Sequence, residues 1–529
     1  MRYAIPRKNR EFASWPAIAE LPSLVARNVE LKSAYAFSIL DLPFGEYARL
    51  CRAAVAKAAA RFAADIGIAP GAIGRAPVIA TGHQPELFHA GVWIKNFLAF
   101  RLAQLLGGSS VNLIVDNDIP KHLGLVAPVR EDSTARQVEI SFARKAAEHA
   151  FEEYPPLIEG ADAFVGAVSQ AATRAPFHEA AVDLARRLAA ASGRGANIGD
   201  VLAAVRLSYE RELSIANSEV PTSRLADEGA FGAFAISILQ DALRFASAYN
   251  GSLAQYRRAH HIRSRVNPMP DLVVDSTRVE APFWIWHSGE SRRRLYAAQA
   301  GDEVVLYAGE QEVYRLREAG YSDAEAAWKA LVAVGLKIRP RAITTTLFMR
   351  LFVADLFIHG VGGAEYDEVA DGVVHTFYGV EPPAFATITA TLIVQWGIEE
   401  PTTRPASALK RTLRDIRYNP QIFLDDRPSA PADVRQLVAD KWRLVAFAPT
   451  DRRARQEKWE RIREINGRLS GRLATLEQDT SYELARAEER RAADSVLLSR
   501  DYSVFLTGAR EAARFYDDAL SGLRQTART

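Results

Sequence analysis

The segments PVIATGHQPELFHAGVWIK (residues 77–95) and VNLIVDND (residues 111–118) decide the predicted fold. Residues 77–81 and 111–115 are short apolar runs of the kind that forms buried strands. Residues 91–106 carry apolar side chains at helical spacing, and Gly107-Gly108 ends that helix. A strand, a helix and a second strand within about 40 residues predict a βαβ unit with parallel strands.

The sequence patterns on either side of this unit divide the chain into three predicted regions. Residues 1–75 form an N-terminal helical segment, residues 76–400 an α/β core built on a parallel sheet, and residues 401–529 a helical C-terminal region. Within the core, residues 145–250 are predicted to form a helical insertion. Helices are also predicted at 45–66 and 322–335, and strands at 272–275, 282–286 and 303–307.

The C-terminal region contains an amphipathic pattern. Apolar residues recur at spacings of three and four, at Trp459, Ile462, Ile465, Leu469, Leu473 and Leu476. This spacing predicts an amphipathic helix that forms one arm of a coiled coil. Residues 503–524 are predicted to form a second helix that packs back on it.

Composition narrows the class of protein. The 66 basic and 64 acidic residues leave a net charge of +2 over 529 residues, which favours neither nucleic acid nor an anionic membrane surface. The single cysteine, Cys51, rules out an intrachain disulfide and lies in an Ala-rich run typical of a buried helix. No apolar stretch reaches the length of a membrane span. We expect a cytoplasmic protein that handles a small polar substrate.

The first candidate site follows the strand at 77–81. His83, Gln84 and His89 lie in the loop before the predicted helix, and Lys95 lies within that helix. A helix N-terminus favours anions, and histidines there can bind a phosphate or carboxylate or move a proton. The alternative is that His83 and Gln84 satisfy backbone groups of the loop.

The second candidate site follows the strand at 111–115. It contains Asp116, Asn117, Asp118 and His122. Carboxylates at such a strand end can hold a ribose, an amine or Mg²⁺. The alternative is a helix cap before Pro120.

The third candidate site begins at Arg339-Pro340-Arg341 and continues into a glycine cluster. Clustered glycines let the backbone approach a ligand closely. The binding candidates are Arg341, Gly360, Gly362, Gly363, Glu365, Tyr366 and Asp367. Two basic segments, 256–263 and 292–294, are weaker candidates for phosphate contact.

With these motifs in view, the chain resembles the bacillithiol synthase (cysteine-adding ligase) family. Residues 81–88 are similar to that family's TGQQxGLF segment, residues 115–118 to its EDHD segment, and residues 339–366 to its RPL segment and glycine-rich turn. The resemblance spans about residues 75–520 and is strong only near these motifs. Four residues differ from the family pattern: His83, Glu86, Asn117 and Arg341. In addition, the glycine that follows the phenylalanine is displaced to Gly91, and the lysine, Lys95, lies closer to the motif than in the family.

The resemblance implies a Rossmann-like core, a coiled coil that forms a homodimer, and a ligase that joins cysteine to the amine of glucosaminyl-malate. Under this reading His83, His89 and Asp118 are catalytic, and the other candidates bind substrate or nucleotide. ATP or ADP is the candidate cofactor, Mg²⁺ stays open, and no protein metal site is expected. The departures leave open a different substrate, a non-catalytic nucleotide- or sugar-binding protein, or an interaction module built on the coiled coil.

Overall fold

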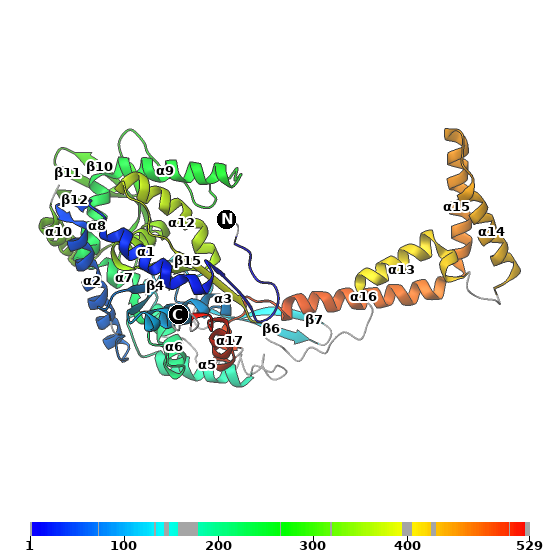
Figure 1. Ribbon diagram of the computed structural model, residues 1–529, viewed down its shortest axis with the longest axis horizontal. Helices are drawn as coiled ribbons and strands as arrows, with labels where there is room; N and C mark the ends of the chain where they lie inside the picture. The colour runs from blue at the N-terminus through cyan, green and yellow to red at the C-terminus, as the bar shows by residue number, and fades with distance from the viewer. Residues whose placement is uncertain are drawn as a thin grey trace. The chain divides into compact units, whose positions relative to one another are not determined.

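The computed structural model divides into two compact units. Unit 1 comprises residues 1–127, 139–394 and 500–529, and unit 2 comprises residues 128–138 and 395–499 (Figure 1). The described residues are 3–71, 73–131, 134–141, 148–156, 178–264, 266–317, 320–393, 405–424, 430–506 and 508–523. None of their helices is long and apolar enough to cross a membrane.

Unit 1 is built around a six-stranded sheet with the order β1-β15-β14-β4-β5-β8. The five strands from β15 to β8 are parallel to one another, and β1 pairs antiparallel with β15 at the edge. In chain order the parallel strands lie fifth, fourth, first, second, third. The bounds are β1 Glu11–Trp15, β4 Val78–His83, β5 Ser109–Ile114, β8 Ser218–Pro221, β14 Leu356–His359 and β15 Ala386–Thr391.

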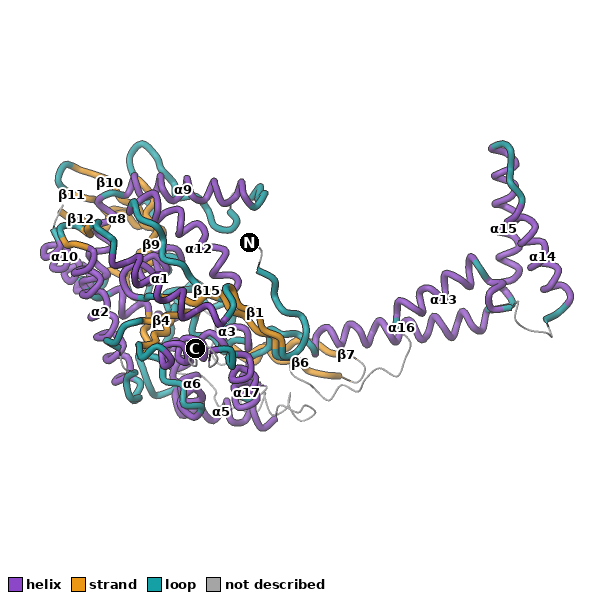
Figure 2. Tube along the Cα trace, in the orientation of Figure 1, coloured by secondary structure: helices purple, strands orange, loops and turns teal. Residues whose placement is uncertain are grey.

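Helices cover both faces of this sheet, as Figure 2 shows by colour. Helix α3 (Ala90–Leu105) connects β4 to β5 and packs on β4, β5 and β15, which confirms the predicted βαβ unit. Alternate strand residues such as Val78, Ala80, Val111 and Leu113 join one core with residues of α2 and α8. The other helices of unit 1 are α1 Leu21–Ser33, α2 Phe44–Asp65, α5 His178–Ala191, α6 Ile198–Glu212, α7 Thr222–Ala226, α8 Gly229–Gln240, α9 Ala242–Ala259, α10 Tyr321–Ala333, α11 Ala342–Phe348, α12 Val361–Val373 and α17 Ala509–Ala519.

A second, antiparallel sheet in unit 1 has the order β12-β11-β10-β9-β13. Its strands are β9 Val279–His287, β10 Arg293–Ala300, β11 Glu303–Ala308, β12 Gln311–Arg317 and β13 Leu336–Pro340. Two short hairpins, β2 Ser38–Ile39 with β3 Leu42–Pro43 and β6 Gly124–Glu131 with β7 Thr134–Ser141, complete the strands. Single turns of 3-10 or π-helix lie at Ile18–Glu20, Phe151–Glu153, Met349–Val353, Val374–Tyr378, Pro420–Phe423 and Val504–Leu506.

Several predictions outside the βαβ unit need correction. The segment 145–250 is largely helical from residue 178 onward, but it also supplies β8 to the main sheet. Residues 142–147 and 157–177 of that prediction lie outside the described residues. The strand predicted at 272–275 forms only an isolated bridge, Val274 with Val279, whereas the strands at 282–286 and 303–307 are confirmed. Residues 1–75 belong to unit 1 and contribute its edge strand β1.

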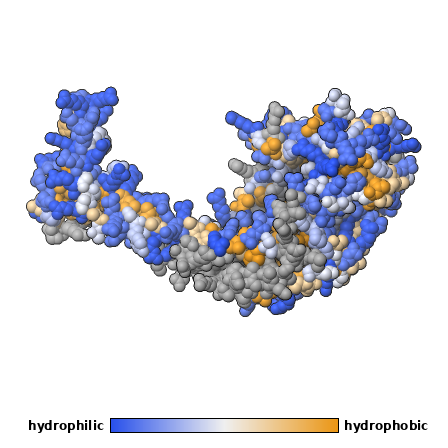
Figure 3. Space-filling model, turned by 180° about the vertical axis from the view of Figure 1, so that it is seen from behind, coloured by the Kyte–Doolittle hydropathy of each residue, from blue (hydrophilic) through white to orange (hydrophobic). Residues whose placement is uncertain are grey.

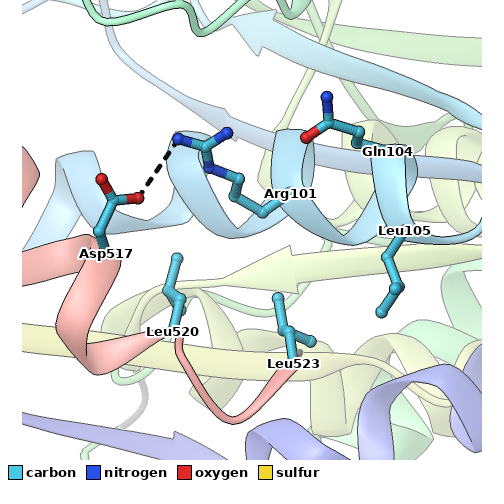
Figure 4. A pocket seen from close by; sticks show the side chains of 6 residues that line it. All are labelled: Arg101, Gln104, Leu105, Asp517, Leu520 and Leu523. Atoms are coloured by element: carbon cyan, nitrogen blue, oxygen red, sulfur yellow. Dashed lines mark hydrogen bonds and ion pairs between the residues drawn. The ribbon is translucent and has the colours of Figure 1, made fainter. Parts of the chain in front are cut away.

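The predicted packing of residues 503–524 on the helix at 459–476 is wrong. Helix α17 packs on α3 in unit 1, where the Tyr516 hydroxyl donates to the Ala90 carbonyl at 2.8 Å. Beside that contact, Arg101 of α3 and Asp517 of α17 form an ion pair of 3.3 Å (Figure 4). The large apolar residues of this segment are buried within unit 1, and burial of apolar surface fixes the position of the helix there.

Unit 2 is helical where it is described, apart from residues of the β6–β7 hairpin. Its helices are α13 Ala406–Tyr418, α14 Ala432–Ala446, α15 Arg452–Gly471 and α16 Ala474–Leu497. Helix α13 packs on α16. Helix α14 packs on α15 around a small core of Val434, Val438 and Leu469. The predicted continuous helix through 476 is interrupted between α15 and α16, at residues 472–473.

Candidate functional site

A cleft of about 830 Å³ lies in unit 1 at the carboxyl ends of β4 and β14. The chain leaves β4 toward β5 on one side and leaves β14 toward β15 on the other, so the connections diverge at this point. Open α/β sheets bind ligands in the crevice that such a divergence creates. The size of the cleft is within the range of small-molecule sites.

Most of the residues predicted from sequence line this cleft. They are His83, Gln84, His89, Lys95, Asn117, Asp118, Arg341, Gly360, Gly362, Gly363 and Tyr366. The strand ends and the loops after them bring these three separate motifs together. Four other predicted residues, Asp116, His122, Glu365 and Asp367, are not among the lining residues.

Lys95 is the most informative residue of the cleft. Its side chain is buried, and its ammonium donates to the Gly82 carbonyl at 2.7 Å. No described carboxylate forms an ion pair with it, and burial alone lowers its pKa from 10.5 to about 7. Burying an ammonium without a counter-charge costs free energy, and an anion bound beside Lys95 would offset that cost.

Helix α12 presents its N-terminus to the same cleft. The N-cap is Gly360, which has no side chain to cap the first amides, so the amides of the first turn stay available for a ligand. A Cβ at Gly360 or Gly362 would meet nothing within 4 Å, whereas one at Gly363 would lie 2.8 Å from Nδ1 of His359. The first two glycines leave open space at the cleft, and the third allows the helix to pack on His359.

Beneath this helix turn, His359 belongs to a buried charged network. Its Nε2 lies 2.6 Å from Oδ2 of Asp367, which also accepts from Arg350 at 2.9 Å. Burial by itself would raise the pKa of Asp367, but the charges of His359 and Arg350 bring it down to about 2. Asp367 therefore orients a cleft residue instead of contacting a ligand directly.

His89 and Arg500 lie where α3 begins. Nδ1 of His89 accepts from the Gly91 amide at 3.1 Å and caps the helix, so the proton of the neutral ring is on Nε2. Burial, and then the nearby Arg500 charge, lower the pKa of His89 to about 4. Near neutral pH this residue is a hydrogen-bond donor and not a cation.

Arg500 adds a second cation that the sequence prediction missed. Its Nη2 lies 3.2 Å from Thr389 Oγ1 and 3.1 Å from the Ala390 carbonyl, both in β15. Its Nε and Nη1 are buried without a partner among the described residues. A Cβ at Gly91 would lie 2.5 Å from Nη2 of Arg500, so glycine is needed for this approach. Local sequence offers no signal, because Arg500 follows a long helical region.

His83 at the end of β4 is held by the protein. Its Nδ1 lies 2.8 Å from the Gln84 carbonyl, and its Nε2 lies 3.3 Å from Oδ1 of Asn96. Burial and the charges of Lys95 and Arg206 lower the pKa of His83 well below its usual value. Both ring nitrogens face protein acceptors, which disfavours a proton-transfer role for a neutral ring with a single N–H.

The opposite wall of the cleft combines an aromatic ring with arginines. The guanidinium carbons of Arg292 and Arg341 lie 4.5 and 4.3 Å from the ring centre of Trp284. Arg292 pairs with Asp118 at 2.9 Å, and Arg341 pairs with the buried Glu280 at 2.7 Å. The basic segment 292–294 is a weak candidate by sequence, yet Arg292 lines the cleft.

The remaining predicted residues have other environments. Gln84 donates to Asp118 at 2.9 Å, and Asn117 donates to the Pro340 carbonyl at 2.8 Å. Asp116 is buried and accepts from the Ser223 amide and hydroxyl, which ties β5 to α7, and burial raises its pKa to about 7. His122 is exposed and pairs with Glu139 at 3.0 Å.

The charge of the cleft is predominantly positive. Asp118 and Asp501 are the lining carboxylates, against Lys95, Arg292, Arg341 and Arg500. No group of three or more His, Cys, Asp or Glu residues suited to a metal occurs in the described parts of the chain. A scan against protein-family models and a search of curated proteins return no match to this chain.

Proposed function

We propose that this chain is an enzyme of the ligase class with a Rossmann-like core, which binds a small anionic substrate or nucleotide at the cleft. Following the resemblance to bacillithiol synthases, the reaction joins an amino acid to the amine of a sugar conjugate. The observation that supports this most is Lys95, a buried ammonium without a carboxylate partner, in a cleft that also contains the uncapped start of α12.

Amide formation requires a carboxylate that has been activated, for example by phosphate, and a free amine. Lys95, Arg500 and the amides of α12 supply positive potential for the anionic part. Nε2–H of His89 adds a neutral donor. On the other wall, Asp118 is partly exposed and is held by Arg292 and Gln84, so its carboxylate can accept a hydrogen bond from an amine or sugar hydroxyl.

The test is calorimetric titration of the full chain with pyrophosphate, ADP and ATP, each with and without Mg²⁺. We expect binding that Lys95→Met weakens about ten- to a hundredfold, as expected for loss of a charge-assisted hydrogen bond. Lys329→Met is the matched control, because Lys329 is 62% exposed and pairs with Glu325 on α10. Equal affinity of wild type and Lys95→Met for every anion would contradict the proposal.

A non-catalytic binding protein on the same scaffold is the second candidate, and the environment of His83 favours it. A neutral imidazole with both nitrogens against protein acceptors is poorly placed to transfer a proton. The two candidates differ in turnover. Release of ADP, AMP or pyrophosphate from ATP with amino acids and glucosaminyl-malate supports the ligase, and binding without any release supports the binding protein.

We also propose that unit 2 forms a homodimer and that its helices make the coiled coil expected from sequence. Trp442, Phe447 and Trp459 are 51, 52 and 59% exposed on α14, at its end and on α15. Figure 3 shows that the face drawn is largely hydrophilic, with scattered hydrophobic residues. Large exposed aromatic residues are typical of association surfaces.

Light scattering after gel filtration tests the dimer. The double variant Trp442→Glu/Trp459→Glu is expected to be monomeric at concentrations where wild type is dimeric. Tyr482→Glu is the control, since Tyr482 is 64% exposed on α16. A monomeric wild type, or a dimer that persists in the double variant, would reject this interface.

A further inference from the structure

A second cavity lies in unit 1 at the opposite ends of the same strands. It measures about 610 Å³ and is bounded by α1, by α2 and by the residues that begin β4 and precede β14, Val78 and Asp355. The cleft described above lies at the carboxyl ends of β4 and β14, and this groove lies at their amino ends. The two cavities share no lining residue.

Three cations face one carboxylate in this groove: Lys32, Arg49, Arg52 and Asp355. Lys32 is buried, donates to the Ala354 carbonyl at 2.8 Å and lies 3.7 Å from Asp355. Arg52 pairs with Asp355 at 2.7 Å, while its Nε is buried without a partner. Arg49 is exposed and forms no ion pair or hydrogen bond with any described residue.

Asp355 cannot balance these cations alone. Its Oδ1 accepts from Arg52, and its Oδ2 accepts from the Val78 amide at 2.8 Å. Its single charge is therefore shared between two cations and the start of β4. Burial lowers the pKa of Lys32 to about 8; the charge of Asp355 opposes this shift, and the charge of Arg52 adds to it.

Apart from Ser33 and Tyr35, the other side chains that line the groove are apolar. Its walls include Val29 of α1, Phe44 and Ala48 of α2, and Ile73 and Ala76 before β4. Val29 is 44% exposed in spite of its apolar side chain. A site with an apolar wall and a few convergent charged groups is typical of a small-molecule pocket.

We propose that this groove binds a small amphipathic organic anion, whose carboxylate or phosphate meets Arg49, Arg52 and Lys32 and whose apolar body lies against α1 and α2. This site is independent of the proposed ligase activity. The cations attract the charged end, and the alanines of α2 leave room for a flat ring or an acyl chain. A metal ion is disfavoured by the excess of positive charge.

Calorimetric titration of the full chain with 2-naphthoate, 2-naphthyl phosphate and the neutral 2-naphthamide tests the proposal. We expect the anions to bind at least about tenfold more tightly than the amide, because hydrogen bonds to charged groups are the stronger ones. Arg49→Glu should weaken the anions at least about tenfold and leave the amide unchanged. Inorganic phosphate should bind more weakly than naphthyl phosphate, since it lacks the apolar body.

Two further variants separate this groove from other sites. Ala53→Trp places a large ring at an exposed lining position of α2 and should abolish binding of all three naphthyl compounds. Arg27→Glu makes the same charge change on an exposed residue of α1 that does not line the groove, and it should have no effect. Circular dichroism confirms that each variant is folded.

Four outcomes would overturn the proposal. The first is that the protein binds naphthoate and naphthamide with equal affinity, and the second is that inorganic phosphate binds as tightly as naphthyl phosphate. The third is that the naphthyl anions bind Arg49→Glu and Ala53→Trp as tightly as wild type. The fourth is that none of the compounds binds at millimolar concentrations. Loss of naphthoate binding in Lys95→Met, with retention in Arg49→Glu, would also overturn it, because the anion would then occupy the cleft at the carboxyl ends.

Discussion

Replacing Lys95 by methionine is expected to stabilise the protein while weakening its affinity for anions. In the folded chain, burial lowers the pKa of Lys95 from 10.5 to about 7, and no described carboxylate compensates. Keeping this amine folded at pH 7 costs up to about 4 kcal/mol, from the difference between the two pKa values. Methionine has a similar length and no charge, so it removes that cost.

The loss of one hydrogen bond opposes this gain. The ammonium donates to the Gly82 carbonyl at 2.7 Å, and an unsatisfied buried carbonyl costs about 1–3 kcal/mol. The net expectation at pH 7 is that Lys95→Met raises the free energy of unfolding by about 1–3 kcal/mol. Such an opposition between stability and function is typical of binding sites.

The pH dependence of this stability difference shows whether the buried charge of Lys95 is its cause. Between pH 7 and 10.5 the unfolded chain holds the Lys95 proton and the folded chain does not, so the stability of wild type rises with pH in that window. The advantage of the variant should therefore shrink by up to about 1.4 kcal/mol per pH unit above pH 7. Below pH 7 both states are protonated and the difference is constant.

Urea unfolding of wild type and variant at pH 6, 7, 8 and 9 measures this difference. Lys337→Met is the control, because Lys337 is paired with Glu152 and Glu153 at 3.3 and 2.6 Å and its removal should destabilise the protein. If Lys95→Met is less stable than wild type at pH 7 and binds pyrophosphate with unchanged affinity, the reasoning about an unpaired buried charge is wrong.

Two further predictions concern the packing around the cleft. Gly91→Ala should lower the free energy of unfolding by about 1–3 kcal/mol in urea titrations, because its Cβ would lie 2.5 Å from Arg500 Nη2 and 2.6 Å from the Ala390 carbonyl. Gly45→Ala is the control: its Cβ would meet nothing within 4 Å, so it should be neutral or slightly stabilising. Equal effects of the two substitutions would contradict the steric argument. In the folded chain the pKa of Asp367 is lowered to about 2, so its carboxylate stabilises wild type by about 2–3 kcal/mol, and this contribution is lost as pH falls from about 4 through about 2. Asp367→Asn should remove the contribution at neutral pH. Identical acid unfolding of the two proteins would exclude it.

The βαβ unit could be predicted from sequence because its signals are local. The apolar runs that form β4 and β5, and the helical spacing of α3, lie within one short segment. Most of the polar residues predicted after these strands line the cleft, because parallel strands end at one edge of a sheet. Asp116 and Asp367 do not line it, because each carboxylate is buried against a partner from another element, Ser223 and Arg350.

Strand β8 and the role of Arg500 in the cleft could not be predicted from local sequence patterns. The sequence of β8, Ser218–Pro221, is short and half polar, and it is a strand only because β5 pairs with it in parallel. Arg500 reaches the cleft because the chain returns to unit 1 after unit 2. No periodicity near residue 500 indicates this return. It depends on contacts of Arg500 with Thr389 and Ala390, which are more than 100 residues away in the sequence.

Because the chain returns to unit 1 after unit 2, the bounds of a deletion decide whether it separates assembly from ligand binding. Removing everything after residue 430 would take away Arg500, together with Phe505 and Tyr516, whose rings lie 5.2 and 6.0 Å from that of Trp93 on α3. That truncation would expose the apolar surface of α3 and disturb the cleft, so a loss of binding would say nothing about unit 2. A deletion confined to residues 405–499 keeps these contacts. Because Arg500 contacts the end of β15, the flank of such a deletion that begins at Arg500 lies on unit 1 beside the cleft.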